Sequence, residues 1–545
     1  MSTNTSTPTL LDIRGLSITY GTGKDAVIAA DHLDLELKAG QIVALVGESG
    51  SGKTTLAKAI IGLLPDSAHI AGGAVELAGE NLLAHTNKQM QEVRGRRIGM
   101  VPQDPGASLD PVKTIGSQIA EVFRLHPQGH KRSKAQLRTE VIRLLELVGI
   151  DTPEQRIGQY PHELSGGLKQ RVLIAIAFAL EPELLIADEP TSALDVTVQL
   201  TVLEVFTKLA RELGTAVIFV THDLAVATDI ADRIVVMQHG RIREDNTVRE
   251  ILRAPEDPYT RMLLDEATPA DFRARTGERA GAPEVPAIEV VGLTKVYGHG
   301  KTRRAAVDEV SFVVRPGTTF SLVGESGSGK STTARMVMRL LEPTAGAVKI
   351  HGQDVTNVQG AAKRDLWRSL QLVYQNPDSA LDPRYSVSRI ISEPLENYNI
   401  GSKAERRTRV AELLDAVNLP SRMAELRAKE LSGGQRQRVA IARALALGAK
   451  TLVLDEALSA LDVLTQAQIL RLLEDLQVNQ GLSYLFISHD LHVVERISHD
   501  VGVMRSGQLV EVGTTEQVFG NPASQYTRLL LDSNPGALLR EMANN

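Results

Sequence analysis

The hydrophobic residues of this chain follow two recurring patterns, one alternating and one continuous. Apolar and polar residues alternate over residues 33–37 and, apart from Val313, over 310–314, which predicts antiparallel strands with one buried face. Residues 42–46, 184–187 and 216–220 form continuous apolar runs, which predict strands buried on both faces of a parallel sheet. Because such strands alternate with helical stretches, the pattern is typical of an α/β fold.

Helical patterning fills the stretches between these strands. We expect a helix to start at Lys53, and the mostly helical stretch between Gln103 and Ser165 to form a separate helical lobe. Residues 172–180 are the longest apolar candidate for a membrane span. They fall well short of the roughly 20 apolar residues that a membrane helix needs, so a buried helix is predicted there. If the protein works at a membrane, other chains must span it.

The whole pattern is written twice along the chain. Four motifs of the first half return in the same order in the second half. They are VGESGSGKT at 46–54 and VGESGSGKS at 323–331, LSGG at 164–167 and 431–434, IADEPTSALDV at 186–196 and LDEALSALDV at 454–463, and THDL at 221–224 and SHDL at 488–491. Lys53 and Lys330 are 277 positions apart, whereas Ser165 and Ser432 are 267 apart. The second copy is therefore shorter between these motifs, and the chain is a duplicated domain.

The chain is too long for one hydrophobic core. It has 545 residues, and single cores stop growing at about 250–300 residues. We expect a loose tail over 1–9, a first domain over 10–264, a linker over 265–287 and a second domain over 288–545. A flexible linker of that length would span roughly 25 Å, enough for the two domains to meet within one chain, and pairing between two chains stays open.

Composition excludes several classes of protein. Apolar residues make up 43% of the chain and charged residues 23%, an ordinary globular profile. The formal net charge of -6 is small for this length and gives no general basic face for nucleic acid. Because the chain contains no cysteine, disulfides, zinc–cysteine sites and iron–sulfur clusters are excluded.

Residues 47–54 fit the phosphate-loop pattern G-x-x-x-x-G-K-[ST] between a predicted strand and a predicted helix. Its glycines let backbone N–H groups turn toward a phosphate, and the helix N-terminus adds a favourable dipole. Lys53 is expected to reach the terminal phosphates, and Thr54 to ligate magnesium. A second match over 324–331, in the same context, makes a chance occurrence negligible.

Acidic residues follow a predicted buried strand in each copy. Asp188 and Asp455 each come directly after an apolar run, where a carboxylate is well placed to hold magnesium through water. Glu189 and Glu456 come next, as candidate bases for an attacking water. A lone Asp-Glu pair after a strand is more often a solvated loop. Its recurrence behind a phosphate loop favours the catalytic interpretation.

Each LSGG motif precedes a long predicted helix, with Ser165 or Ser432 as its cap. Alone, the motif is an ordinary capped helix start, although it also presents N–H groups suited to an anion. A domain with its own phosphate loop has no evident need of another anion site. We therefore interpret the motif as serving the nucleotide of the other domain.

Each copy carries its motifs in the same order: the phosphate loop (Walker A), the LSGG signature, the Asp-Glu pair (Walker B), the SALD loop and the histidine of THDL or SHDL (the switch histidine). This combination resembles the ATP-binding-cassette (ABC) ATPases, and the resemblance covers nearly the whole chain. The resemblance implies two tandem P-loop NTPase domains, each with a parallel-sheet core, an antiparallel β subdomain and a helical subdomain. It implies two cassettes packed head-to-tail around two ATP molecules with Mg²⁺. Each site would combine the phosphate loop of one copy with the signature of the other.

The site residues are carried over position by position. The resemblance implies nucleotide binding by Tyr20, Gly47, Ser49, Gly50, Gly52, Lys53, Thr54, Thr55, Gln103, Ser165, Gly166, Gly167, Tyr297, Gly324, Ser326, Gly327, Gly329, Lys330, Ser331, Thr332, Gln375, Ser432, Gly433, Gly434 and Gln435. The implied metal ligands are Thr54, Gln103, Asp188, Ser331, Gln375 and Asp455. The implied catalytic residues are Glu189, His222, Glu456 and His489.

Some positions carry less weight than others. Tyr20 and Tyr297 resemble the aromatic residue that stacks on adenine; as bare residues they fit a core equally well, and only their shared offset favours stacking. Leu168 stands where the signature often has Gln, and Ala457 stands where the first copy has Pro190. Neither departure removes a catalytic group, so two competent sites are predicted.

Further segments resemble the peptide and nickel importer branch of the family. Gln103 and Gln375 resemble the glutamine of the family's Q-loop. The segments that begin with them, residues 103–121 and 375–395, look like the segment of that branch where a membrane subunit docks. Residues 253–264 and 520–531 look like a C-terminal Pro-Tyr-Thr element, although an amphipathic helix packing on its own domain is an equal interpretation. Together these segments imply an ATPase that powers import of dipeptides or oligopeptides, with the two ATPase subunits of such an importer fused in one chain.

The resemblance also implies partners and a location. We expect two integral-membrane permease subunits, an extracytoplasmic substrate-binding protein, and a peripheral position on the cytoplasmic face of the cell membrane. No nucleic-acid partner is expected. Because selectivity resides largely in the pore and the binding protein, nickel, glutathione and peptide antibiotics stay open as substrates. Some related ATPases carry a cysteine-ligated iron–sulfur cluster, which this chain cannot hold.

Twin cassettes of other classes fit the sequence less well. A translation factor would need a long charged helical linker between its cassettes, whereas residues 265–287 are short and contain prolines. A DNA-repair cassette would carry zinc-binding cysteines, and this chain has none. A chromosome-structural ATPase would place a coiled coil between the phosphate loop and the signature, where only 112 positions separate Lys53 from Ser165. Multidrug exporter ATPases are commonly fused to membrane helices.

Overall fold

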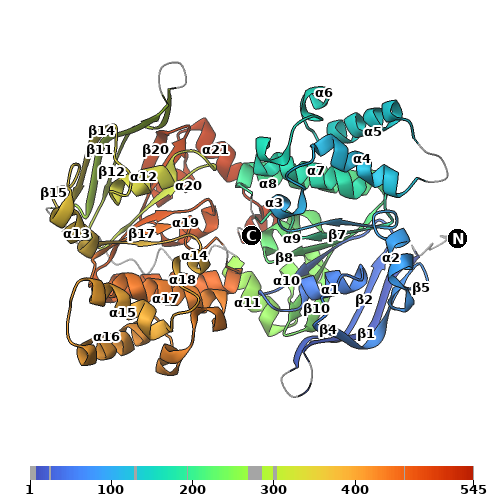
Figure 1. Ribbon diagram of the computed structural model, residues 1–545, viewed down its shortest axis with the longest axis horizontal. Helices are drawn as coiled ribbons and strands as arrows, with labels where there is room; N and C mark the ends of the chain where they lie inside the picture. The colour runs from blue at the N-terminus through green and yellow to red at the C-terminus, as the bar shows by residue number, and fades with distance from the viewer. Residues whose placement is uncertain are drawn as a thin grey trace. The chain divides into compact units, whose positions relative to one another are not determined.

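Two compact units make up the protein in the computed structural model (Figure 1). The structure describes residues 8–21, 23, 26–127, 132–192, 194–267, 285–298, 303–459 and 461–543. The first unit comprises Met1–Thr268 together with Pro535–Asn545, and the second comprises Pro269–Asn534. Most of the predicted tail and of the predicted linker lies outside the described residues, so those two boundaries stay predictions.

An antiparallel sheet of four strands forms one layer of the first unit, in the order β2-β1-β4-β5. Its strands are β1 (Thr9–Tyr20), β2 (Val27–Lys38), β4 (Ala68–Leu77) and β5 (Glu80–Asn81). Leu33, Leu35 and Leu37 are buried while the residues between them are exposed, as the alternating pattern predicts. One face of this sheet therefore packs on the core and the other meets solvent.

The second sheet of the first unit has six strands in the order β10-β9-β3-β8-β7-β6. They are β3 (Ile42–Val46), β6 (Ile98–Val101), β7 (Leu184–Asp188), β8 (Ala216–Thr221), β9 (Arg233–Gln238) and β10 (Arg241–Thr247). All neighbouring strands are parallel except β9 and β10. Every residue of β3, β7 and β8 is buried, because helices cover both faces of a parallel sheet.

Helices complete the first unit. They are α1 (Lys53–Ile60), α2 (Asn87–Val93), α3 (Pro105–Ser108), α4 (Ile115–Leu125), α5 (Lys134–Leu147), α6 (Pro153–Arg156), α7 (Gly166–Phe178), α8 (Val196–Leu213), α9 (Leu224–Ile230), α10 (Val248–Arg253) and α11 (Pro258–Ala267). Apolar side chains of α4, α5 and α7 share one buried cluster, which confirms a helical lobe before Ser165. Helix α7 begins directly after Ser165, whose side chain caps it.

The second unit repeats this architecture. Its sheets have the orders β12-β11-β14-β15 and β16-β17-β18-β13-β19-β20. The strands are β11 (Ile288–Tyr297), β12 (Arg304–Val314), β13 (Thr319–Val323), β14 (Ala345–Ile350), β15 (Gln353–Asp354), β16 (Leu370–Val373), β17 (Thr451–Asp455), β18 (Ser483–Ile487), β19 (Asp500–Arg505) and β20 (Gln508–Thr514). The helices are α12 (Lys330–Val337), α13 (Gly360–Ser369), α14 (Pro377–Ala380), α15 (Val387–Asn397), α16 (Lys403–Ala416), α17 (Gly433–Leu445), α18 (Val463–Gln480), α19 (Leu491–Ile497), α20 (Thr515–Gly520) and α21 (Gln525–Asp532).

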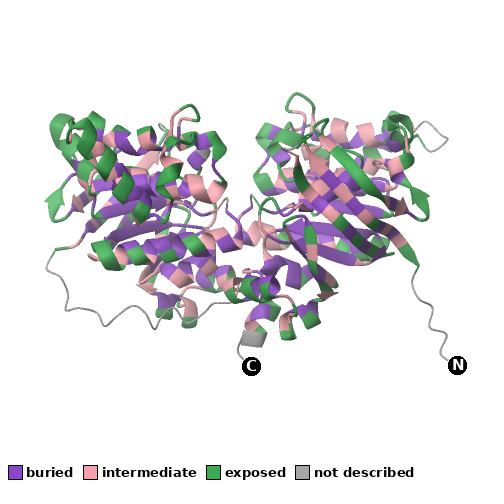
Figure 2. Cartoon of the chain, turned by 90° about the horizontal axis from the view of Figure 1, so that it is seen from below, coloured by how far each residue is buried: buried purple, intermediate pink, exposed green. Residues whose placement is uncertain are grey.

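Burial runs through the middle of each unit (Figure 2). Each unit has two large clusters of buried apolar side chains, one around the parallel strands and the helical lobe, the other between the parallel strands and the antiparallel sheet. Among the residues that the structure describes, no helix is both long enough and apolar enough to cross a membrane.

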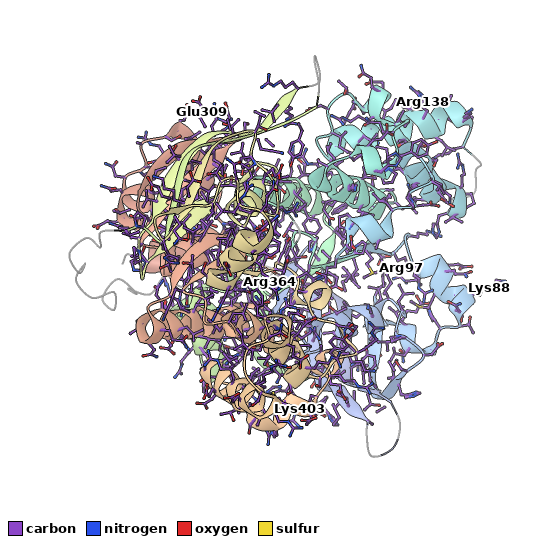
Figure 3. All side chains as sticks on the ribbon, turned by 60° about the vertical axis from the view of Figure 1, so that its left-hand side comes forward. Lys88, Arg97, Arg138, Glu309, Arg364 and Lys403 are labelled. Carbon is purple, nitrogen blue, oxygen red and sulfur yellow. The ribbon has the colours of Figure 1, made fainter. Side chains whose placement is uncertain are left out.

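Charged side chains lie at the surface of both units (Figure 3). Arg97 joins two layers of the first unit: its Nη1 lies 2.7 Å from Glu80 Oε2 in β5, and its Nε lies 2.7 Å from Glu183 Oε1, just before β7. Arg138 on α5 and Lys403 on α16 are exposed. Ion pairs at such positions contribute at most about 1 kcal/mol each, so the apolar clusters carry the fold.

The C-terminal end of the chain belongs to the first unit. Helix α22 (Ala537–Ala543) contacts α9. The backbone N–H of Gly536 donates to Asp229 Oδ2 over 2.7 Å. Burial raises the pKa of Asp229, and this N–H bond acts in the opposite direction. Leu539 is buried, so the helix packs its apolar side onto the unit.

Candidate active sites

The predicted site residues of the first unit gather at one edge of its six-stranded sheet. Strands β3, β7 and β8 are parallel and neighbouring, so their carboxyl ends meet at this edge. The phosphate loop follows β3, Asp188 ends β7, and His222 follows β8. Gln103 lies beyond the end of β6, the next strand. The fold therefore brings together residues that are far apart in the sequence.

The phosphate loop is packed tightly against strand β9. Gly47 has a φ of +154°, and a methyl group there would lie 2.1 Å from the carbonyl oxygen of Met237. Only glycine fits this approach of two backbones. Lys53 is 5% exposed, and its Nζ donates to Gly47 O at 2.7 Å and to Glu48 O at 2.8 Å. The buried ammonium thus takes carbonyl partners from its own loop, as a buried charge requires.

Strand β13 and helix α12 hold the corresponding loop of the second unit in the same way. Lys330 Nζ donates to Gly324 O at 2.7 Å and to Glu325 O at 2.8 Å. A methyl group on Gly324 would lie 2.1 Å from Met504 O. The exposed loop positions are Ser49, Gly50, Ser326 and Gly327. In each unit the loop thus surrounds a lysine ammonium that an incoming anion can attract.

A hydroxyl–carboxylate pair lies beside each loop. Thr54 Oγ1 donates to Asp188 Oδ1 at 3.0 Å, and Ser331 Oγ donates to Asp455 Oδ1 at 2.9 Å. Burial raises the pKa of Asp188 and of Asp455 above the ordinary value, although the hydroxyl bonds act in the opposite direction. A desolvated carboxylate next to a hydroxyl is a set of hard oxygen donors, which fits Mg²⁺. No cluster of three or more potential ligands of the His, Cys, Asp and Glu types occurs among the described residues.

Glu189 is held by two side chains. Gln103 Nε2 donates to its Oε2 at 2.9 Å, and His222 Nδ1 lies 3.3 Å from its Oε1. Burial opposes ionisation, but the bond from His222 and the charges of His222 and Lys53 outweigh it and keep the pKa of Glu189 below its usual value. Burial likewise opposes protonation of His222, and Glu189 outweighs it, so the pKa of His222 is raised. Glu189 is therefore an ionised carboxylate beside the phosphate loop.

Glu456 has the same surroundings in the second unit. Gln375 Nε2 donates to its Oε2 at 2.7 Å, and His489 Nδ1 lies 3.7 Å from its Oε1. The bond from His489 lowers the pKa of Glu456 and outweighs burial. Glu189 and Glu456 both have a left-handed backbone, with φ of +46° and +49°. A non-glycine residue in this region carries strain, and here both candidate bases share it.

The two predicted adenine-stacking tyrosines lie in different surroundings. Tyr20 ends β1, and its Oη lies 3.2 Å from Thr55 Oγ1 on the helix behind the phosphate loop. Tyr297 ends β11 and is 48% exposed, with Lys295 Nζ 5.5 Å from the centre of its ring. Thr332 matches Thr55 in the second unit. The stacking role of both tyrosines stays a prediction.

The signature residues start α7 and α17. Ser165 Oγ accepts from Leu168 N, and Ser432 Oγ accepts from Gln435 N. A methyl group on Gly167 would lie 2.3 Å from Val198 Cγ1 on α8, so packing alone demands this glycine. Gly434 approaches Thr465 Cγ2 in the same way, at 2.4 Å. The remaining signature glycines, Gly166 and Gly433, and the loop glycines Gly52 and Gly329 lie at the starts of their helices.

Sequence reasoning missed one pair of residues at these sites. The hydroxyl of Tyr259 on α11 accepts a hydrogen bond from Glu48 N in the phosphate loop at 3.0 Å. The hydroxyl of Tyr526 on α21 accepts from Glu325 N at 3.4 Å. The recurrence of Pro-Tyr-Thr-like segments 267 positions apart was the available signal. It marks both tyrosines but does not say what their hydroxyls contact.

Family models and known relatives both match this chain. The family model described as ABC transporter matches residues 30–192 and 307–459, and the model described as oligopeptide/dipeptide transporter, C-terminal region, matches 510–538. The oligopeptide transport ATP-binding protein OppD of Mycobacterium tuberculosis is 41% identical over 606 residues, which cover 96% of this chain and 98% of the relative. The glutathione import ATP-binding protein GsiA of Salmonella typhimurium is 42% identical over 569 residues, covering 97% and 90%. A solved bacterial ABC transporter cassette is 31% identical, covers 42% of this chain and 98% of its own, and superposes with a TM-score of 0.39.

Proposed function

This chain belongs to the ABC transporter family as an ATPase with two cassettes, and on that premise we propose that it powers the import of short peptides across a membrane. The observation that carries the proposal is the match of residues 510–538 to an oligopeptide/dipeptide transporter C-terminal region. Relatives that resemble this chain over 96–97% of its length are named for oligopeptide transport and for glutathione import. Glutathione is itself a short peptide, so both names agree with this substrate class.

The described geometry supports one role for each group of side chains that recurs in the two copies. Lys53 and Lys330 would exchange their loop carbonyls for the terminal phosphates of ATP. Glu189 and Glu456 would accept a proton from the water that attacks the terminal phosphorus of ATP. The bond between the water oxygen and phosphorus forms as the bond between phosphorus and the ADP oxygen breaks. His222 and Gln103 hold Glu189 in place for this step.

Magnesium fits the oxygen donors beside each loop. Thr54 and Asp188 would hold it in the first cassette, and Ser331 and Asp455 in the second, with Gln103 and Gln375 nearby. When bound, Mg²⁺ neutralises charge on the phosphate oxygens. The raised pKa of Asp188 supports the assignment, because a buried carboxylate gains most from a neighbouring cation.

Membrane permease subunits are the partners that an import ATPase of this family requires. We propose that two such subunits dock near α3 and α14, which follow Gln103 and Gln375, and that a separate binding protein delivers the substrate. The chain would then lie at the cytoplasmic face of the cell membrane. Completion of each ATP site by the signature of the other cassette also belongs to this proposal and rests on the sequence resemblance.

The proposal is tested by purifying the tagged full-length chain from its native membrane and assaying ATP hydrolysis by the recovered complex. The wild type is compared with Glu189→Gln and Glu456→Gln. Each assay is run with a mixture of di- to pentapeptides, with glutathione and with nickel ions. We expect two membrane subunits to co-purify, and peptide to stimulate hydrolysis in the wild type. Because each single variant leaves one site intact, Glu189→Gln combined with Glu456→Gln should lose at least about 100-fold in kcat while still binding ATP.

Glu183→Gln is the matched control. Glu183 is paired with Arg97 at the surface, away from the phosphate loop, so the same change of side chain should leave kcat within twofold. Stimulation by nickel without stimulation by peptide would replace the peptide proposal with metal import. Recovery of ribosomes with no membrane subunit would overturn the transport proposal and leave only the ATPase.

A further inference from the structure

One peptide group in each phosphate loop is held from both of its ends. In the first unit it joins Gly47 to Glu48. Its carbonyl oxygen accepts from Lys53 Nζ at 2.7 Å, and its N–H donates to Tyr259 Oη at 3.0 Å. Since carbonyl and N–H belong to one rigid plane, the two bonds together fix how that plane is turned.

The second unit contains the same arrangement. Lys330 Nζ donates to Gly324 O at 2.7 Å, and Glu325 N donates to Tyr526 Oη at 3.4 Å. Each tyrosine comes from a helix about 200 positions further along the chain, 211 in the first unit and 201 in the second. Both rings are 5% exposed. The repeat in two separately folded units makes an accidental contact a poor explanation.

A carboxylate fixes the segment that carries each tyrosine. Glu244 is 7% exposed and accepts from Glu256 N at 3.0 Å and from Asp257 N at 3.1 Å, directly before α11. Glu511 accepts from Ala523 N at 2.7 Å and from Ser524 N at 3.0 Å, directly before α21. In each unit the Pro-Tyr-Thr element is thus anchored to the last antiparallel strand pair of the six-stranded sheet, β9–β10 or β19–β20. The tyrosine that contacts the phosphate loop follows this anchor in the sequence.

An amphipathic helix that only covers the core has no need of this hydroxyl. Leu263 and Leu264 already bury the apolar side of α11, and phenylalanine would supply the same ring as tyrosine. A buried tyrosine hydroxyl requires a polar partner, and here that partner is a phosphate-loop amide. We therefore favour a role of the Pro-Tyr-Thr element at the phosphate loop over the alternative that its helix only packs on its own domain.

We propose that Tyr259 and Tyr526 are positioning residues for the two nucleotide sites. Each hydroxyl keeps the first peptide group of its loop turned so that the carbonyl faces the lysine and the loop keeps its shape around the ammonium. The lysine leaves that carbonyl when ATP binds, and the tyrosine then keeps the loop in its binding shape. This inference rests on the nucleotide sites proposed above.

The test is nucleotide binding by the purified full-length chain. Tyr259→Phe and Tyr526→Phe, singly and together, keep the ring and remove only the hydroxyl. The probe is N-methylanthraniloyl-ATP in EDTA, followed by fluorescence. We expect the dissociation constant to rise about three- to tenfold in the double variant, the effect of one neutral hydrogen bond per site. KM for ATP should rise by a similar factor, with kcat at saturating ATP within twofold of wild type.

Tyr484→Phe is the matched control. The Tyr484 hydroxyl is buried and donates to Leu473 O at 2.8 Å, so its loss should lower the urea midpoint without changing nucleotide affinity. Wild-type affinity in the double variant, or an equal loss of affinity in Tyr484→Phe, would overturn the positioning role. Lys53→Ala with Lys330→Ala separates the two proposals: unchanged binding there would instead overturn the nucleotide sites themselves.

Discussion

Gln103 donates a hydrogen bond from Nε2 to Glu189 Oε2 over 2.9 Å, so an amide, and not a second carboxylate, faces the candidate base. Gln103→Glu would place two negative charges in hydrogen-bonding contact. Repulsion of like charges raises the pKa of a carboxylate and displaces it. With Gln375→Glu made in the same chain, so that both sites are changed, we expect kcat for ATP hydrolysis at pH 7 to fall at least tenfold, with ATP affinity within threefold, measured by steady-state kinetics and nucleotide binding.

Gln136→Glu serves as the control for that substitution. Gln136 accepts from Ser133 N in the capping box of α5, where glutamate is equally suited. Its kcat should stay at the wild-type value. A wild-type kcat in the doubly substituted chain would mean that Glu189 is not the group that the amide of Gln103 serves.

The contact between His222 and Glu189 predicts a stability difference that depends on pH. The pKa of His222 is raised from 6.5, so its contribution is complete below pH 6.5 and is lost as pH rises through the raised value. The pKa of Glu189 is lowered from 4.5, so its contribution is present above pH 4.5 and is lost as pH falls through the lowered value. Wild type should therefore exceed His222→Gln in unfolding free energy most clearly between pH 4.5 and 6.5.

Urea unfolding at pH 5.5 and pH 8.5 measures this difference. We expect at least half of the gap between wild type and His222→Gln to disappear at pH 8.5. His69→Gln is the control, because His69 is exposed in β4. A gap of equal size at both pH values would contradict the charged pair.

The sequence predicts most of the site because its chemistry depends on short contiguous motifs. Strand β3 matches the predicted run Ile42–Val46 to the residue, since Gln41 and Gly47 bound five apolar residues. The phosphate loop, Asp188, Glu189 and His222 can be read in the same way. Each of them ends or directly follows a buried strand, so the position of the strand fixes the position of the side chain.

Contacts between distant segments could not be predicted in this way. An amphipathic pattern says which side of α11 is buried, but not that Tyr259 reaches Glu48 N. No periodicity links Gly536 to Asp229, 307 positions earlier. For Gly167 the LSGG motif predicts only anion binding, whereas the closeness of Gly167 to Val198 depends on how α7 and α8 pack. Such features follow from tertiary packing, which one sequence does not reveal.

Gly167 offers a direct test of that packing. A methyl group there would lie 2.3 Å from Val198 Cγ1, so Gly167→Ala must displace α8 or strain α7. Overpacking of this kind costs about 1–3 kcal/mol. We expect a loss of that size in the free energy of unfolding, measured with urea. Val198→Ala in the same chain should restore at least half of it, because it removes the methyl group that clashes.

Gly158→Ala is the control for the glycine substitution. A methyl group on Gly158 would meet nothing within 4 Å, so this variant should stay within about 0.5 kcal/mol of wild type. If Val198→Ala simply adds its own loss to that of Gly167→Ala, the two residues do not clash and the packing explanation fails.

Glu244→Gln should weaken both stability and nucleotide binding. Burial opposes ionisation of Glu244, but N–H donors including Glu256 N and Asp257 N outweigh it and lower its pKa. The amide of glutamine accepts with one oxygen only, so one N–H loses its partner, at a cost of about 1–3 kcal/mol. Because this carboxylate anchors the segment before Tyr259, the dissociation constant for ATP should rise in the same direction as in Tyr259→Phe.

Glu250→Gln is the matched control, since glutamine can replace glutamate in the capping box of α10. Combining Glu244→Gln with Tyr259→Phe decides whether the anchor acts through the tyrosine. If Glu244 acts through Tyr259, the double variant binds ATP as tightly as whichever single variant binds it less tightly, because the second substitution removes a hydroxyl contact that the first has already broken. Fully additive losses would mean that Glu244 stabilises the cassette by a route that does not pass through the phosphate loop.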